Sequence, residues 1–229
     1  MDDIIQLKCF AMQKTLSILV KDKTTKKNIV WATDGYTQFG EMYSEGSQLT
    51  VEALTGFDPI MIQPRIKKAL VKQQERTRSH AEVFTPPRIC NKMNNYCDEE
   101  WFGRKNVFNI EIEQSWKTVH NKIEFHEKKD WKQYIDSRRL EITCGEAPYI
   151  VSRYDASTGE IIDIVDRIGI LDRKLRIVGE NANDQDEWLK WATRAFQSVY
   201  GYEYQGDSLL IGRINLLMTF VDYLDFKWH

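Results

Sequence analysis

The sequence has few of the residues that mark metal sites or disulfide-rich secreted folds. Its 229 residues include only four cysteines and four histidines, and no Cys-x-x-Cys pair occurs. A structural zinc site needs closely spaced cysteine and histidine ligands, so we expect no metal site. The scattered cysteines are typical of reduced thiols in a cytosolic protein.

Long apolar runs and a basic leader are also missing. The chain begins Met1-Asp2-Asp3, which is acidic where a secretory signal is basic. Residues 4–20 are the most apolar early stretch, but Lys8, Lys14 and two glutamines make it too polar to span a bilayer. We therefore expect a soluble, cytoplasmic protein with no membrane association.

Two common nucleotide-binding motifs are absent. Neither a Walker loop nor a Gly-x-Gly-x-x-Gly segment occurs, which argues against a nucleoside-triphosphatase or a nicotinamide enzyme. The net charge of -2 shows no general affinity for nucleic acid, although a balanced total can hide a local basic face. With 42% hydrophobic residues the chain has enough apolar side chains for a core, so disorder is not expected.

The pattern of apolar residues predicts alternating helices and short strands in the second half of the chain. Such alternation favours an α/β fold with parallel strand pairing. We expect a mainly helical N-terminal region over residues 1–80 and a second domain over 81–229. The aromatic-rich stretch 98–136 is expected to be irregular. The predicted helices cover 4–20, 51–54, 65–80, 88–96, 167–178, 187–199 and 208–226, and the predicted strands cover 29–32, 140–143, 160–164 and 202–204. Thr50 is the predicted cap of the helix 51–54, and Asn183-Asp184 that of the helix 187–199.

A predicted strand that ends in a turn of small residues is the most informative feature. Residues 140–142 are followed by Thr143-Cys144-Gly145-Glu146. Gly145 has no side chain and tolerates positive φ, so the backbone of this turn can approach a ligand closely. Glu203 ends a later predicted strand, and ligands of open α/β sheets bind outside the carboxyl ends of the strands.

These segments resemble the cofactor-binding half of an adenine-specific DNA methyltransferase. The stretch 140–148 is similar to the motif in which an acid precedes a Cys-Gly turn under S-adenosylmethionine, with Ala147-Pro148 in place of the usual second glycine and aromatic residue. Phe84-Thr85-Pro86 resembles the upstream motif that closes over the cofactor. Tyr200-Gly201-Tyr202-Glu203 resembles the second strand, whose acid accepts hydrogen bonds from the ribose hydroxyls, and 210–217 resembles the helix that follows it.

From residue 29 onward the chain is similar to the N-terminal part of restriction endonuclease subunit M. Residues 81–87 and 101–108 belong to this likeness. The resemblance implies a partial Rossmann-like methyltransferase layer and S-adenosylmethionine as the cofactor. The residues that it places at the cofactor are Phe84, Thr85, Pro86, Glu141, Thr143, Cys144, Gly145 and Glu203.

The adenine-positioning loop of these enzymes is missing. That loop reads Asn/Asp-Pro-Pro-Tyr/Phe; it orients the exocyclic amine and stacks on the flipped base. The sole Pro-Pro pair here is Pro86-Pro87, preceded by Thr85 and followed by Arg88. We expect the loop to lie beyond residue 229, and we predict no catalytic residue and no methyl transfer by this chain alone. Because open sheet edges are a liability, a second chain is a candidate partner.

A basic stretch between residues 65 and 78 carries six cations and one acid, Glu75. Such a run can follow a phosphate backbone. The alternative is a solvated helix face with Ile66, Leu70 and Gln73 turned inward. The candidate nucleic-acid-binding residues are Arg65, Lys68, Lys72 and Arg76.

Two hypotheses of function remain open. The leading one is a methyltransferase-like protein of restriction–modification, and hence of phage defence, that acts on DNA and retains the S-adenosylmethionine half. The rival is a non-catalytic phage or mobile-element protein that docks onto a nucleic-acid-bound host defence complex and inhibits it. A neighbouring reading frame that encodes Asn-Pro-Pro-Tyr would favour the first.

Overall fold

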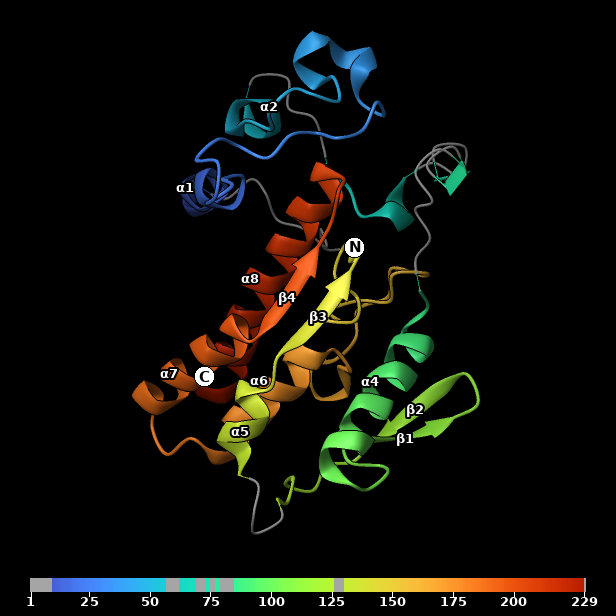
Figure 1. Cartoon of the computed structure of the whole chain (residues 1–229), viewed down its shortest axis with the longest axis vertical. Coiled ribbons are helices and arrows are strands. Elements are labelled where there is room, and N and C mark those ends of the chain that lie inside the picture. The colour runs from blue at the N-terminus through green and yellow to red at the C-terminus, as the bar shows by residue number, and fades with distance from the viewer. Residues whose placement is uncertain are drawn as a thin grey trace.

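The computed structural model describes residues 10–56, 62–68, 73–74, 77–78, 85–125 and 130–228 (Figure 1). These residues form a mixture of helices and strands, as the predicted α/β class requires. The helices are α1 (Phe10–Leu19), α2 (Val51–Thr55), α4 (Pro87–Phe102), α5 (Trp131–Asp136), α6 (Ile170–Asn181), α7 (Gln185–Gln197) and α8 (Gly206–Trp228), and the strands are β1 (Asn109–Ile112), β2 (Ser115–Thr118), β3 (Arg139–Ile142) and β4 (Val199–Tyr202).

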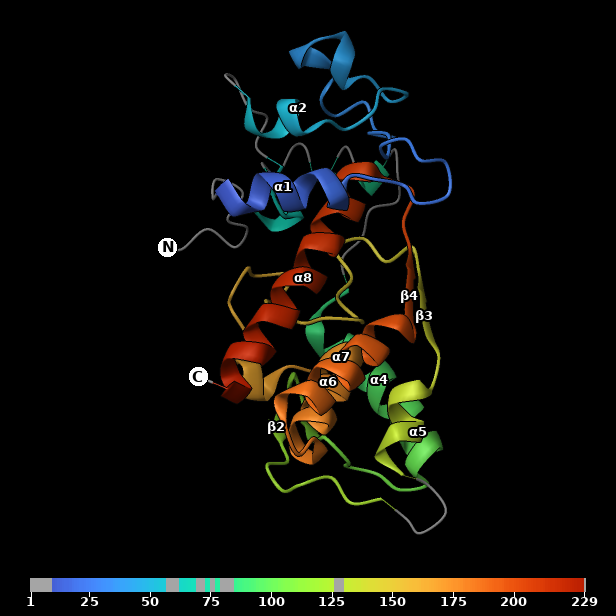
Figure 2. The same cartoon turned by 90° about the vertical axis from the view of Figure 1, so that its left-hand side faces the viewer.

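Strands β3 and β4 pair in parallel, with Glu141 opposite Gly201, which confirms the predicted parallel pairing. Parallel strands need a crossover connection, and α6 and α7 lie within it. Figures 1 and 2 show α6, α7 and α8 on one side of the two strands. The other face of this sheet is open: its side chains are 44–69% exposed and comprise Leu140, Ile142, Tyr200 and Tyr202.

Two apolar clusters form the core. The larger one joins α6, α7 and α8 to a group of edge-on and tilted rings around Phe102, Phe108 and Tyr134. The smaller one packs Leu16, Trp31 and other N-terminal residues against the first turns of α8, and Figure 2 shows α1 crossing that end of α8. Helix α8 therefore contributes to both clusters.

Several local predictions are confirmed. Thr50 accepts a hydrogen bond from the Ala53 N–H at the start of α2 (3.1 Å). Asp184 does the same for Glu187 at the start of α7 (2.8 Å). Short polar side chains at these positions satisfy backbone donors that a helix leaves unpaired at its first turn.

Other predicted elements are wrong. Residues 29–32 form no strand, since Val30 makes a single isolated bridge to Gln48. Residues 160–164 likewise make a single bridge, through Ile161 to Tyr154. The stretch 98–136 is more regular than expected, because it holds the end of α4, the β1–β2 hairpin and α5.

The predicted helix from Arg65 to His80 is wrong at its start. Residues Arg65–Lys67 form one 3-10 turn, and Lys68 is extended (φ -75°, ψ 147°). The physical reason is tertiary: the Arg65 N–H donates to the Glu146 carboxylate (2.6 Å) and the Lys68 ammonium to Asp207 (3.1 Å).

Over the described residues, no helix is both long and apolar enough to cross a bilayer.

Candidate functional site

A cavity of about 730 Å³ opens at the carboxyl ends of β3 and β4. One wall comes from α4, and the floor comes from the turn after β3. The segment after β4 and the first residues of α6 and α8 complete the cavity. Its size falls within the range of roughly 300–1,000 Å³ that is usual for small-molecule and cofactor sites. Its lining includes Thr85, Asn94, Cys97, Glu141, Thr143, Cys144, Gly145, Tyr149, Glu203, Gln205 and Ser208.

The turn after β3 has a strained backbone. Thr143, Gly145 and Ala147 have φ values of 55°, 54° and 67°. Left-handed conformations are costly for side chains such as threonine, and they persist where the surrounding structure enforces them, often at ligand sites. Here the Cys144 N–H continues the β3–β4 ladder by donating to the Tyr202 carbonyl (2.9 Å). The turn is thereby held against the end of β4.

Glu203 connects the ends of the two strands. One oxygen of its carboxylate accepts from the Gly145 N–H (2.7 Å) and the other from the Gln205 N–H (2.9 Å). The predicted turn glycine and the predicted downstream acid therefore touch each other. A carboxylate in this position can accept hydrogen bonds from ligand hydroxyls through its remaining lone pairs.

Glu141 lies in the cavity wall and is 9% exposed. Burial raises the pKa of its carboxyl to about 8, the backbone N–H groups of Tyr149 and Ile150 lower it, and the charge of Glu203 adds to the rise. Its Oε2 atom is buried and has no hydrogen-bond partner among the described residues. Since buried polar atoms are normally paired, this oxygen has spare capacity for a ligand donor.

Helix α8 supports the turn from below. A Cβ atom at Gly212 would lie 3.2 Å from the Gly145 carbonyl oxygen, so the helix approaches the turn very closely. Asn215 donates to the Glu146 carbonyl (3.1 Å). The Glu146 carboxylate accepts from the Tyr154 hydroxyl (2.5 Å) and from the Arg65 N–H. Through these hydrogen bonds Glu146 holds the turn to Asn215 of α8, to Tyr154 and to the backbone at Arg65.

The structure brings most of the predicted cofactor residues together. Six of them line this cavity: Thr85, Glu141, Thr143, Cys144, Gly145 and Glu203. Pro86 lies beside it, at the residue before α4. Phe84 is outside the described residues.

Sequence reasoning missed four polar residues of the cavity. Tyr149, Gln205 and Ser208 closely follow predicted site residues, and this proximity was a usable signal. Asn94 had no such signal in the sequence, because α4 lies about 50 residues before the turn at Gly145. The Asn94 amide donates to the carbonyls of Tyr149 and Ile168 (3.0 Å each).

The structure describes two of the predicted nucleic-acid-binding residues, Arg65 and Lys68. The Lys68 side chain is 9% exposed and pairs with Asp207, which also accepts from the Tyr36 hydroxyl (2.9 Å). Arg65 donates through Nη2 to Thr77 (2.7 Å). Lys72 and Arg76 lie outside the described residues. Arg65 and Lys68 therefore contact protein groups, and their binding to nucleic acid stays a prediction.

Comparison with known proteins gives no match. No family model fits the chain, and neither a curated protein nor a solved structure shows significant similarity to it. Function is therefore argued from the cavity and the residues that line it.

Proposed function

We propose that the chain is a methyltransferase-like protein of the restriction–modification type, with a partial Rossmann-like layer that binds S-adenosylmethionine. The observation that carries the proposal is the contact between Glu203 and Gly145 at the carboxyl ends of two adjacent parallel strands. Ligands of open α/β sheets bind at that end of the strands. Such a protein acts in the cytoplasm, where its DNA lies.

The lining residues suit the chemistry of this cofactor. Glu203 offers carboxylate oxygens to the two ribose hydroxyls, and Gly145 allows the backbone to approach. Glu141 has an oxygen in the wall that no other described residue bonds. Thr85 lies at the opposite side, before α4. When bound, S-adenosylmethionine supplies an electrophilic methyl group on its sulfonium, and the contribution of this chain is to bind and orient it.

Cys97 allows a test of where the cofactor binds. It is an exposed thiol that lines the cavity, whereas burial raises the pKa of Cys90 and Cys144 to about 12 and suppresses their thiolates. In a Cys9→Ser background, S-adenosylhomocysteine should slow alkylation of Cys97 by iodoacetamide, while adenosine triphosphate should not. An unchanged alkylation rate at saturating S-adenosylhomocysteine would contradict this location.

A second part of the proposal concerns activity. The chain has no Asn-Pro-Pro-Tyr segment to hold a flipped adenine. Purified alone it should transfer no tritiated methyl group to double-stranded DNA. Methylation above the no-enzyme background would show that another segment positions the base.

The open face of the β3–β4 sheet supports the idea that a second chain covers and completes this sheet. Parallel sheets are normally covered on both faces, yet Ile142 and Tyr202 are 69% and 65% exposed. The same face favours the rival function, a non-catalytic inhibitor that docks onto a nucleic-acid-bound defence complex. Binding of S-adenosylhomocysteine would support the methyltransferase-like function. No binding of S-adenosylhomocysteine, together with stable binding of the chain to a defence complex, would support the inhibitor function.

A further inference from the structure

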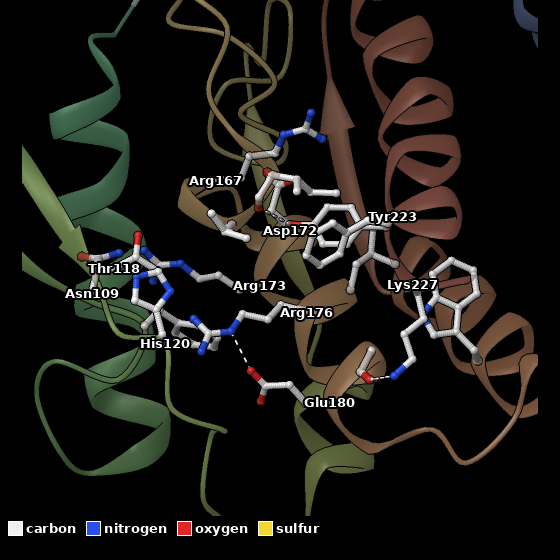
Figure 3. Close-up of a pocket in the computed structure, with 17 residues that line it drawn as sticks. Asn109, Thr118, His120, Arg167, Asp172, Arg173, Arg176, Glu180, Tyr223 and Lys227 are labelled. Atoms are coloured by element: carbon white, nitrogen blue, oxygen red, sulfur yellow. Dashed lines mark hydrogen bonds and ion pairs between the residues drawn. The ribbon is translucent and has the colours of Figure 1, made fainter. Parts of the chain in front are cut away.

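A second cavity, of about 260 Å³, lies between α6, α8 and the region of the β1–β2 hairpin (Figure 3). It shares no lining residue with the cavity at the ends of β3 and β4. Arg173 and Arg176 extend from α6 toward the side of Thr118, while Tyr223 and Lys227 approach from α8. The proposal for this cavity is therefore independent of the methyltransferase proposal.

Aromatic and aliphatic side chains form much of the lining. They include Phe108, Leu175, Trp188 and Tyr223. The guanidinium carbons of Arg173 and Arg176 lie 5.1 and 5.9 Å from the centre of the Phe108 ring. Two cationic groups thus lie against one aromatic ring, in a cavity whose lining also holds polar and charged residues such as Asn109, Thr118 and Asp172.

Buried donors in this lining lack acceptors. Arg173 is 2% exposed. Its Nη1 donates to Asp98 (2.6 Å) and its Nη2 to Asn91 and Asn95 (2.8 Å each), but its Nε has no hydrogen-bond partner among the described residues. The buried Nη1 of Arg167 also has none within that part of the chain. Unpaired buried donors are uncommon in native structures, and a ligand with acceptor oxygens would satisfy them.

The charges that face the cavity favour a monoanion. Glu180 is already bonded to Arg176 (2.7 Å) and to the Ile123 N–H (2.8 Å). Asp172 accepts from Ser152, and its burial raises the pKa of its carboxyl. A dianion would meet stronger repulsion from these two acids than a monoanion would. Four cations line the cavity, Arg167, Arg173, Arg176 and Lys227, and acids already pair with three of them: Asp222 with Arg167, Asp98 with Arg173 and Glu180 with Arg176.

Gly179 keeps one wall of the cavity open. It lies inside α6, where glycine is less favourable than alanine. An added Cβ would meet no atom within 4 Å, so close packing does not explain the glycine. Because Gly179 lines the cavity, a larger side chain at this position would extend into it.

We propose that this cavity binds a small aromatic monocarboxylate, with its ring among Phe108, Trp188 and Tyr223 and its carboxylate facing Arg173 and Arg176. The volume of about 260 Å³ is just below the usual range for larger organic ligands, which limits the ligand to the size of a substituted benzoate. The apolar lining excludes water from the ring, and the guanidinium groups supply charge-assisted hydrogen bonds.

Fluorine NMR with 4-fluorobenzoate tests the proposal on the full chain. We expect saturable line broadening that benzoate reverses, and affinity about tenfold or more weaker for the neutral 4-fluorobenzamide. Gly179→Leu, which fills the cavity, should abolish binding, and Arg176→Gln should weaken it about tenfold or more. The matched control is Arg88→Gln, an exposed arginine of α4 outside both cavities.

Three results would overturn the proposal. The first is no broadening at millimolar 4-fluorobenzoate, and the second is equal affinity for the acid and the amide. The third is undiminished binding to Gly179→Leu with an unchanged thermal unfolding curve. If Gly179→Leu does not fold, the affinities of the wild type for 4-fluorobenzoate and 4-fluorobenzamide still test the proposal.

Discussion

The carboxylate of Glu203 lies 2.7 Å from the backbone nitrogen of Gly145, although 58 positions separate the two residues in the chain. The parallel register of β3 and β4 brings them together, because Ile142 pairs with Tyr202, Glu203 directly follows β4, and Gly145 lies in the turn directly after β3. An acceptor group and a close-approach turn thus share the end of one small sheet.

The first prediction concerns the pH dependence of stability. The folded pKa of Glu141 is about 8 and its ordinary value is 4.5, so between these values the folded state binds a proton that the unfolded state has lost. Stability should therefore fall as pH rises from about 5 to 8, by an amount on the order of 1 kcal/mol per pH unit. Glu141→Gln should remove this dependence, as measured by urea unfolding at several pH values.

The control for Glu141→Gln is Glu160→Gln, an exposed acid outside the cavity. It should leave the pH profile of the wild type unchanged. Parallel profiles for wild type and Glu141→Gln would show that the Glu141 carboxyl is not held protonated in the fold.

The second prediction compares two helix glycines. Gly179→Ala should stabilise the protein by about 0.5–1 kcal/mol, because alanine is the better helix former and its methyl group meets free space. Gly212→Ala should show no such gain, since its Cβ would press on the Gly145 carbonyl oxygen at 3.2 Å. Urea unfolding measures both. Equal increases in stability for the two variants would mean that the turn at Gly145 can shift away from α8 at little cost.

The third prediction concerns Lys68. Because Lys68 and Asp207 are 9% and 0% exposed, replacing the cation removes a charged hydrogen bond from a buried carboxylate. Lys68→Met should destabilise the fold by about 3 kcal/mol, whereas the neighbouring exposed Lys67→Met should change stability by less than about 0.5 kcal/mol. A Lys68→Met protein of unchanged stability and weakened DNA binding would instead support its predicted contact with nucleic acid.

Sequence reasoning succeeded where the signal was local. Caps such as Thr50 and Asp184 lie within three residues of the groups that they bond, and the turn at Gly145 follows its strand directly. It failed where distant partners decide the conformation. Lys68 is extended and bonded to a residue 139 positions away, and Asn94 reaches the site through a bond across 55 positions.

The apolar run 29–32 shows the same limit. Its composition is typical of a strand, but Ala32 has a φ of 48°, and the segment packs Trp31 into the N-terminal cluster. Strand propensity describes a fit to a pleated surface, and within the described part of the chain no neighbouring strand provides that surface. Such positions depend on packing that pattern alone does not specify.

Calorimetric titration with S-adenosylhomocysteine tests the central claim most directly. The wild type should bind one ligand weakly and saturably, Glu203→Ala should show no binding because its ribose acceptor is lost, and Glu160→Ala should match the wild type. Thermal unfolding of each variant checks that it is folded. No heat from the wild type at millimolar ligand, or unchanged binding by folded Glu203→Ala, would contradict the proposed cofactor site.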